Sequence, residues 1–277
     1  MNLYVNPISQ RQLDQLQQSE SQSVLLTGPS GIGLLTITIE TWKATGKRQH
    51  IVYPEKEGLT DREKGVISIE NIRRLYDEMR TFDPQGRIII IDRADTMGIP
   101  AQNAFLKLLE EPNVDTTFIL LAHTTRSLLP TILSRVQKVS IRPISKAQST
   151  QLLTEIGASD KQTIAQLLFI ASGLPAALTQ LYNDTARFAQ RSAIVRDARQ
   201  FLAASRYERL LLAKQYKDNR ENALLLLQDA MKLIELSLLE QKNSQQFMDI
   251  LNRLEQTHRC ISEQGNIRLQ LSALAMV

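Results

Sequence analysis

The sequence predicts an α/β domain with a twisted parallel sheet, followed by a region built of helices alone. In the first part of the chain, short runs of β-branched and other apolar residues alternate with stretches whose apolar residues recur every three or four positions. Beyond residue 184 only the helical spacing continues. Uninterrupted apolar strands are typical of parallel sheets that helices cover on both faces, and the order strand, helix, strand predicts right-handed crossovers.

Length and composition limit the class of protein. The 277 residues are enough for one large domain and one or two small ones, and 43% hydrophobic with 22% charged residues is ordinary for a globular protein. One Cys and three scattered His argue against a disulfide framework and a Cys-based zinc module, so we expect no metal. No apolar run approaches the roughly 20 residues of a membrane span, and no signal peptide is recognisable, which predicts a cytoplasmic protein away from membranes.

The net charge of +4 comes from the C-terminal third. Residues 185–277 hold 14 Lys and Arg against 10 Asp and Glu. We assign this small excess to solvated helix faces rather than to a nucleic-acid surface.

The N-terminal elements begin with a helix over residues 9–18 and a buried strand at Val24–Leu26. The next residues, Gly28–Leu35, have the frame of a phosphate-binding loop, G-x-x-x-x-G-K-[ST]. Leu34 and Leu35 occupy the positions of the lysine and the hydroxyl residue. In a working loop the backbone amides cradle the phosphates, the lysine neutralises their charge and the hydroxyl holds Mg²⁺.

The glycines of this loop, Gly28, Gly31 and Gly33, are candidate phosphate contacts. We expect the loop to be empty, since neither leucine can replace the missing groups. Thr36 lies one position late, so it could supply the hydroxyl only through a shift of register. Backbone amides alone can hold an anion weakly, so residual phosphate binding stays open.

The next elements alternate in the same way. A helix is expected over Ile32–Thr45 and a strand at His50–Tyr53. The charged, glycine-punctuated segment Glu55–Gly65 indicates a surface loop. Ser68 can cap the following helix, whose apolar residues face the sheet.

Residues 86–142 hold the clearest α/β pattern. Arg87–Asp92 is a strand of four isoleucines that ends on a carboxylate, at the edge where open α/β sheets place their ligands. A helix over Pro100–Glu111 is ended by Pro112. Strands at Thr117–Ala122 and Lys138–Arg142 complete the sheet.

Two motifs in this stretch carry a resemblance. The string Asn103–Pro112, with Thr131–Arg135 downstream, resembles the bacterial clamp-loader AAA+ family. An ordinary amphipathic helix that ends at a proline would explain Leu108 and Pro112, but not the whole combination. The resemblance covers residues 1–185 well and the remainder in outline.

The resemblance implies three parts. These are an AAA+ α/β domain with a P-loop-type five-stranded parallel sheet over residues 1–143, a small helical lid over 144–184, and an all-α collar domain for oligomerisation over 185–277. The collar is implied by outline alone, since any helical bundle would give the same apolar stripes.

Several residues of an active nucleotide site are missing. Asp92 matches the Walker-B aspartate, but Arg93 follows where active members carry the glutamate that polarises water. The lid segment Ala171–Leu178 lacks the arginine that active members place near Ala176. Because these groups are missing, we favour for Asp92 the simpler role of a strand-end aspartate that caps a loop.

The family's usual four-cysteine zinc module is absent as well.

Ser134 and Arg135 stand where the family has Ser-Arg-Cys, with Val136 in the place of the cysteine. The resemblance implies that Arg135 is an arginine finger, supplied in trans to the γ-phosphate at a neighbour's site. The alternative is a surface arginine paired with a carboxylate.

These observations favour a non-hydrolysing clamp-loader subunit that binds no ATP itself. Its implied partners are ATPase motor subunits, a delta-type subunit, the sliding clamp and primed DNA. The alternative is an AAA+ ATPase of the motor-subunit or helicase-loader kind with an atypical nucleotide site. A stand-alone DNA-binding module comes last, because the sequence lacks an aromatic-rich basic surface.

Overall fold

The computed structural model describes residues 2–19, 21–79, 84–110, 115–240 and 244–276. The chain divides into two compact units, Met1–Gln180 and Leu181–Val277. The first unit contains the sheet and the predicted lid as far as Gln180, and the second is helical.

The first unit is built on a five-stranded parallel sheet with the order β2-β5-β6-β1-β7. In chain order the strands are β1 (Ser23–Thr27), β2 (Arg48–Val52), β5 (Arg87–Ile91), β6 (Thr116–Ala122) and β7 (Gln137–Ser140). This confirms the predicted sheet. The carboxyl ends of the strands meet at one edge, which fixes where the connecting loops can form a site.

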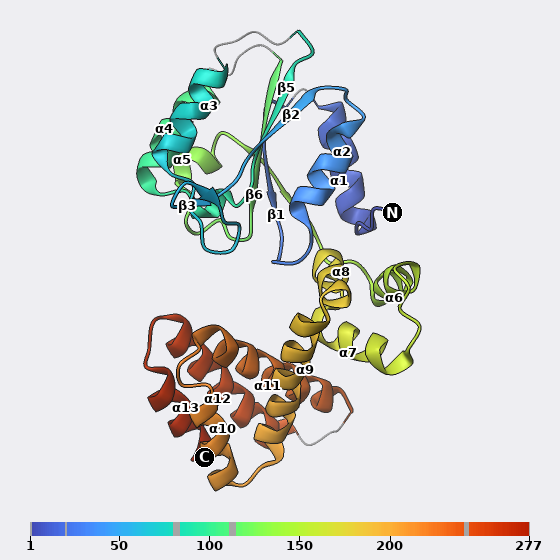
Figure 1. Ribbon diagram of the computed structural model, residues 1–277, viewed down its shortest axis with the longest axis vertical. Helices are drawn as coiled ribbons and strands as arrows, with labels where there is room; N and C mark the ends of the chain where they lie inside the picture. The colour runs from blue at the N-terminus through green and yellow to red at the C-terminus, as the bar shows by residue number, and fades with distance from the viewer. Residues whose placement is uncertain (1, 20, 80–83, 111–114, 241–243, 277) are drawn as a thin grey trace. The chain divides into compact units, whose positions relative to one another are not determined.

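Helices cover both faces of the sheet (Figure 1). One face carries α1 (Pro7–Gln18) and α2 (Leu34–Lys43), and the other carries α3 (Ile69–Met79), α4 (Ile99–Glu110) and α5 (Pro130–Leu133). Successive strand residues alternate between the two cores: Ile89 and Phe118 pack on one side, and Ile88 and Ile119 on the other. The predicted helix end at Glu111 and Pro112 lies outside the described residues.

The segment Glu55–Gly65 is more ordered than expected. Instead of a plain loop it contains a hairpin of β3 (Glu55–Lys56) and β4 (Leu59–Thr60). The two residues between these strands, Glu57 and Gly58, both have left-handed φ angles, of 53° and 80°. Such a pair forms the two-residue turn that matches the twist of a hairpin, and a glutamate at its first position gives no sequence signal for it.

The rest of the first unit is helical. After β5 comes a short 3₁₀ turn, η1 (Ala94–Thr96), and after β7 come α6 (Lys146–Glu155), α7 (Lys161–Ala171) and α8 (Pro175–Asn183), which extends just past the boundary between the units. Ser145 and Gln148 start α6 with a reciprocal capping box.

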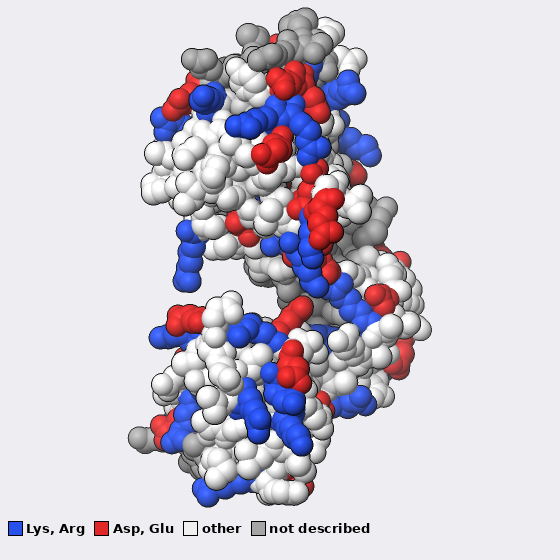
Figure 2. All heavy atoms as spheres, turned by 60° about the vertical axis from the view of Figure 1, so that its left-hand side comes forward, with Lys and Arg blue, Asp and Glu red and all other residues white. Residues whose placement is uncertain are grey.

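The second unit contains helices with a common apolar core. They are α9 (Thr185–Ala203), α10 (Arg206–Gln215), α11 (Arg220–Glu240), α12 (Ser244–Ser262) and α13 (Ile267–Ala275). The side chain of Asn266 accepts from the backbone N–H of Leu269 and thereby caps the last helix. Several Lys and Arg side chains of this unit lie near one another on the face in Figure 2, with acidic side chains among them. No helix of the described part of the chain has the length and apolar character needed to cross a bilayer.

A buried ion pair links two of these helices. Arg191 of α9 binds both carboxylate oxygens of Asp229 on α11, with Nη2 at 2.7 Å from Oδ1. Nearby, the Tyr216 hydroxyl donates to Asp197 at 2.6 Å, and burial together with this bond raises the pKa of Tyr216. Hydrogen bonds between polar side chains thus join the helices of the second unit, in addition to the apolar core.

Removal of one partner of this pair is predicted to destabilise the second unit strongly. In Asp229→Ala the guanidinium of Arg191 would remain largely buried without its counter-charge, so the free energy of unfolding should fall by about 3–5 kcal/mol. Urea denaturation measures this change.

The exposed pair Lys217–Asp218, whose Nζ and Oδ2 atoms lie 3.6 Å apart, provides the control. Asp218→Ala should change the free energy of unfolding by less than about 0.5 kcal/mol. Equal midpoints for the two variants would show that the buried pair contributes no more than a surface pair.

Candidate functional site

The loops after β1, β5 and β6 meet at the carboxyl edge of the sheet. The backbone N–H of Gly28 donates to the carbonyl of Ala122 at 3.4 Å. Nδ1 of His123, which follows β6, lies 2.9 Å from the carbonyl oxygen of Gly28. The residue that follows β6 thus contacts the first glycine of the candidate loop.

The glycine loop connects β1 to α2 through left-handed backbone. Gly31 and Gly33 have φ angles of 84° and 90°, and Gly33 is the N-cap of α2. Leu34 is only 4% exposed and belongs to the core beneath α2, and Leu35 packs against the same core. The two positions that would carry the lysine and the hydroxyl of a working loop therefore contribute apolar packing.

The N-terminal part of α8 packs directly on this loop. The backbone N–H of Ala177 donates to the carbonyl of Gly31 at 2.9 Å. A Cβ atom at Gly31 would come within 2.7 Å of the Cβ of Ala177, and one at Gly33 within 3.3 Å of the Cβ of Ala176. Glycine at these positions thus allows α8 to approach the loop closely. Such close packing is a common reason for glycine, in addition to a left-handed φ angle.

A cavity of about 580 Å³ lies beside the loop. Its lining includes Tyr4, Gly33, Thr36, Pro175 and Ala176. The Tyr4 hydroxyl donates to Glu155 at 2.6 Å, and partial burial with this hydrogen bond raises the pKa of Tyr4 to about 12. This bond ties the N-terminal segment to the end of α6.

Asp92 is 4% exposed at the end of β5, and its carboxylate is already bound. Nε of Arg62, from the segment after the β3–β4 hairpin, lies 2.7 Å from Oδ2 of Asp92. The guanidinium of Arg62 also lies over the ring of Tyr53, 5.8 Å from its centroid. The carboxylate at the Walker-B position therefore anchors the segment that follows the hairpin, and no sequence motif pointed to Arg62.

Arg135 lies two residues beyond α5 and is 39% exposed. Its Nη2 is 2.8 Å from Oε1 of Glu110, the last residue of α4, and its Nη1 donates to the carbonyl of Thr131 at 3.0 Å. The Ser134 hydroxyl donates to the same carbonyl at 3.0 Å. Arg135 is thus exposed enough to reach another molecule. It is also paired with a carboxylate, as the alternative for this arginine stated, although the sequence did not identify Glu110 as the partner.

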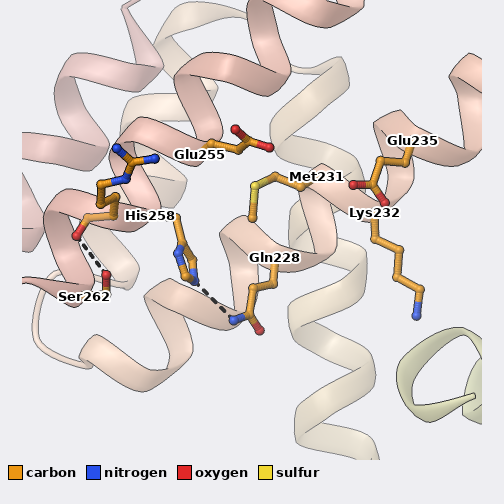
Figure 3. Close-up of a pocket in the computed structure, with 8 residues that line it drawn as sticks. Gln228, Met231, Lys232, Glu235, Glu255, His258 and Ser262 are labelled. Carbon is orange, nitrogen blue, oxygen red and sulfur yellow. Dashed lines mark hydrogen bonds between the residues drawn. The ribbon is translucent and has the colours of Figure 1, made fainter. Parts of the chain in front are cut away.

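The second unit has a groove between α11 and α12, shown in Figure 3. Nε2 of His258 lies 3.1 Å from Nε2 of Gln228, and burial lowers the pKa of His258. Lys232, Glu235, Glu255 and Arg259 give the rest of the groove both signs of charge. Within the described residues, no cluster of three or more His, Cys, Asp or Glu is arranged to hold a metal ion.

The strand order and the glycine loop after β1 define a P-loop-type α/β protein with a helical second unit. A solved DNA polymerase III gamma subunit-related protein from Thermotoga maritima has the same overall fold, with a TM-score of 0.53, 22% identity and coverage of 96% of this chain and 97% of its own. This likeness shows that the two chains share a fold.

Sequence comparisons identify the family. Residues 8–145 match the family model described as DNA polymerase III, delta subunit. DNA polymerase III subunit delta' of Pseudomonas aeruginosa is 32% identical over 139 residues, which are 49% of this chain and 42% of the relative. The Bacillus subtilis protein of the same name is 34% identical over 109 residues, which are 38% of this chain and 31% of the relative.

The chain therefore belongs to the clamp-loader AAA+ family, close to the delta-prime subunits. This confirms the family that the motif string around Asn103 resembles. The matched segments span less than half the length of these two relatives.

The contact between the loop and α8 predicts a specific stability difference between two glycines. Gly31→Ala should reduce the free energy of unfolding by about 2–4 kcal/mol, because a left-handed φ and a steric overlap with Ala177 act together. Gly46, with a φ of 68° and no atom within 4 Å of the place that a Cβ would take, is the matched control.

Gly46→Ala should reduce the free energy of unfolding by about 1–2 kcal/mol, from backbone strain alone. Ala177→Gly in the Gly31→Ala background should recover part of the difference. Thermal and urea unfolding measure all three, and equal losses at the two glycines would refute close packing of α8 on the loop.

Proposed function

We propose that this chain is a non-hydrolysing, delta-prime-like subunit of a DNA polymerase III clamp loader. In this proposal it helps to load the sliding clamp onto primed DNA and supplies Arg135 to the ATPase site of a neighbouring subunit. It is not an enzyme by itself, but a component of the holoenzyme whose activity is DNA-directed DNA synthesis. Its compartment is the cytoplasm, where bacterial replication takes place.

The observation that carries the proposal is the packing of the glycine loop. Leu34 is buried where a working loop needs a cation, and Ala177 lies against Gly31. Asp92, the acidic residue at the end of β5, is paired with Arg62. Phosphate binding, magnesium binding and water activation each need a group that is replaced or already bound. We therefore expect no ATP cofactor at this site.

Arg135 supports the second half of the proposal. It is exposed, and a planar guanidinium can donate two hydrogen bonds to a phosphate at once. An arginine that serves a γ-phosphate in trans stabilises the charge that develops in the transition state. Ser134 turns its hydroxyl back to Thr131, so we assign it the role of shaping the turn before Arg135.

The proposed partners follow from the family. They are the ATPase motor subunits, a delta-type subunit and, through the assembled loader, the sliding clamp and primed DNA. The second unit, with its own helical core, is the proposed collar through which the chain joins the ring.

One observation favours an alternative, an AAA+ ATPase with an atypical nucleotide site. The cavity next to Gly33 is large enough for a small ligand, and the side chain of Thr36 lines it. In this alternative Thr36 would take over the role of the missing hydroxyl.

Substitution of Arg135 tests the proposed role directly. Arg135→Ala should leave folding and ring assembly intact, because an exposed ion pair contributes little stability. Loss of an arginine finger reduces turnover at the site it serves by about 10³–10⁵-fold. Bulk ATP hydrolysis should fall only in part, since the other sites keep their own arginines, and clamp loading should fall further. Clamp- and DNA-stimulated ATP hydrolysis by the reconstituted loader is the measurement.

Arg135→Lys should behave nearly like Arg135→Ala, because a single ammonium group cannot reproduce the planar fork. Arg74 is the control, since it is also exposed and also paired with a carboxylate, that of Glu55 at 2.8 Å. Arg74→Ala should not change turnover. Normal hydrolysis and loading by an assembled ring that carries Arg135→Ala would mean that the chain is a scaffold only.

A further inference from the structure

The ion pair between Arg135 and Glu110 connects two helices that share one rigid core. Ile132 of α5 is fully buried in the cluster that also contains Phe105 and Leu108 of α4. The backbone positions of the arginine and of its carboxylate partner are therefore set by the same packing. The pair cannot separate without rotation of one of the two side chains.

The guanidinium of Arg135 is held at two points that come from different elements. Nη1 donates to the carbonyl of Thr131 within its own turn, and Nη2 lies 2.8 Å from the carboxylate of Glu110. An exposed arginine without partners occupies many rotamers, and the loss of this freedom opposes each contact that it makes. Two fixed acceptors restrict the side chain to a small set of orientations before any neighbour arrives.

The position of Glu110 is unfavourable for the helix that carries it. It lies in the last turn of α4, where the helix dipole disfavours a negative charge. The guanidinium of Arg135 compensates this charge. The favourable electrostatic interaction of the Glu110 carboxylate is therefore with Arg135, whereas its interaction with the dipole of α4 is unfavourable.

We propose that Glu110 is a positioning residue for Arg135. This inference rests on the proposed function, in which the guanidinium reaches the γ-phosphate of ATP on a neighbouring subunit. Glu110 acts through the arginine and touches neither the nucleotide nor the clamp. It holds the fork in a restricted orientation, so less rotational freedom is lost when the phosphate replaces the carboxylate as its partner.

An exposed ion pair contributes little free energy, so we expect its loss to change the turnover number only slightly. Glu110→Gln keeps the shape of the side chain and removes its charge. It should lower the turnover number of ATP hydrolysis by the reconstituted loader about two- to fivefold at the affected site, with little change in KM. Glu110→Asp keeps the charge and should recover part of the loss.

The decisive experiment repeats Glu110→Gln in the Arg135→Ala background. If Glu110 acts only through the arginine, the second substitution has no further effect there. Glu78→Gln is the matched control, because Glu78 also lies in the last turn of a helix, is 56% exposed against 51% for Glu110, and pairs with His50 instead of an arginine. Size-exclusion chromatography verifies that each variant assembles.

The possible outcomes separate the two proposals. A loss with Glu110→Gln that disappears in the Arg135→Ala background supports positioning. A loss of the same size in both backgrounds, or no loss while Arg135→Ala is impaired, overturns positioning and leaves the arginine finger intact. Normal turnover with Arg135→Ala overturns the proposed function and the inference with it.

Discussion

The contact between Gly31 and Ala177 is the constraint on which the candidate site depends. A hydrogen bond of 2.9 Å joins the carbonyl of Gly31 to the N–H of Ala177. The Cβ of Ala177 lies so close to Gly31 that a methyl group on the glycine would not fit. The glycine frame of a phosphate loop therefore has a packing role in this chain. It joins the end of β1 to the helix that begins at Pro175.

Two other residues near the glycine loop also have structural contacts in place of contacts to a nucleotide. Leu34 fills the core beneath α2, and Asp92 binds Arg62 from the segment after the hairpin. The first interaction fills space in the core, and the second satisfies a buried carboxylate that would otherwise need another cation, a metal ion or water. Arg135 differs, since it is exposed and its partner is an exposed carboxylate that it can leave at small cost. This contrast underlies the proposal of an inert site combined with an active arginine.

The sequence predicted what depends on local pattern. The isoleucine run before Asp92 identified a buried parallel strand, the spacing of Gly28 and Gly33 identified the loop, and the motif string around Asn103 identified the family. The pairs Arg62–Asp92 and Gly31–Ala177 could not be foreseen, because their members are far apart in the chain and meet only through tertiary packing. The β3–β4 turn was missed because a glutamate rarely adopts a left-handed φ.

Calorimetric titration of the full chain with Mg-ATP tests the central claim most directly. We predict no binding in the micromolar range, because the lysine and hydroxyl positions are apolar, α8 packs against the loop and Asp92 is already paired. A dissociation constant in the micromolar range would contradict this claim and would favour the atypical ATPase, with the cavity beside Thr36 as its nucleotide site.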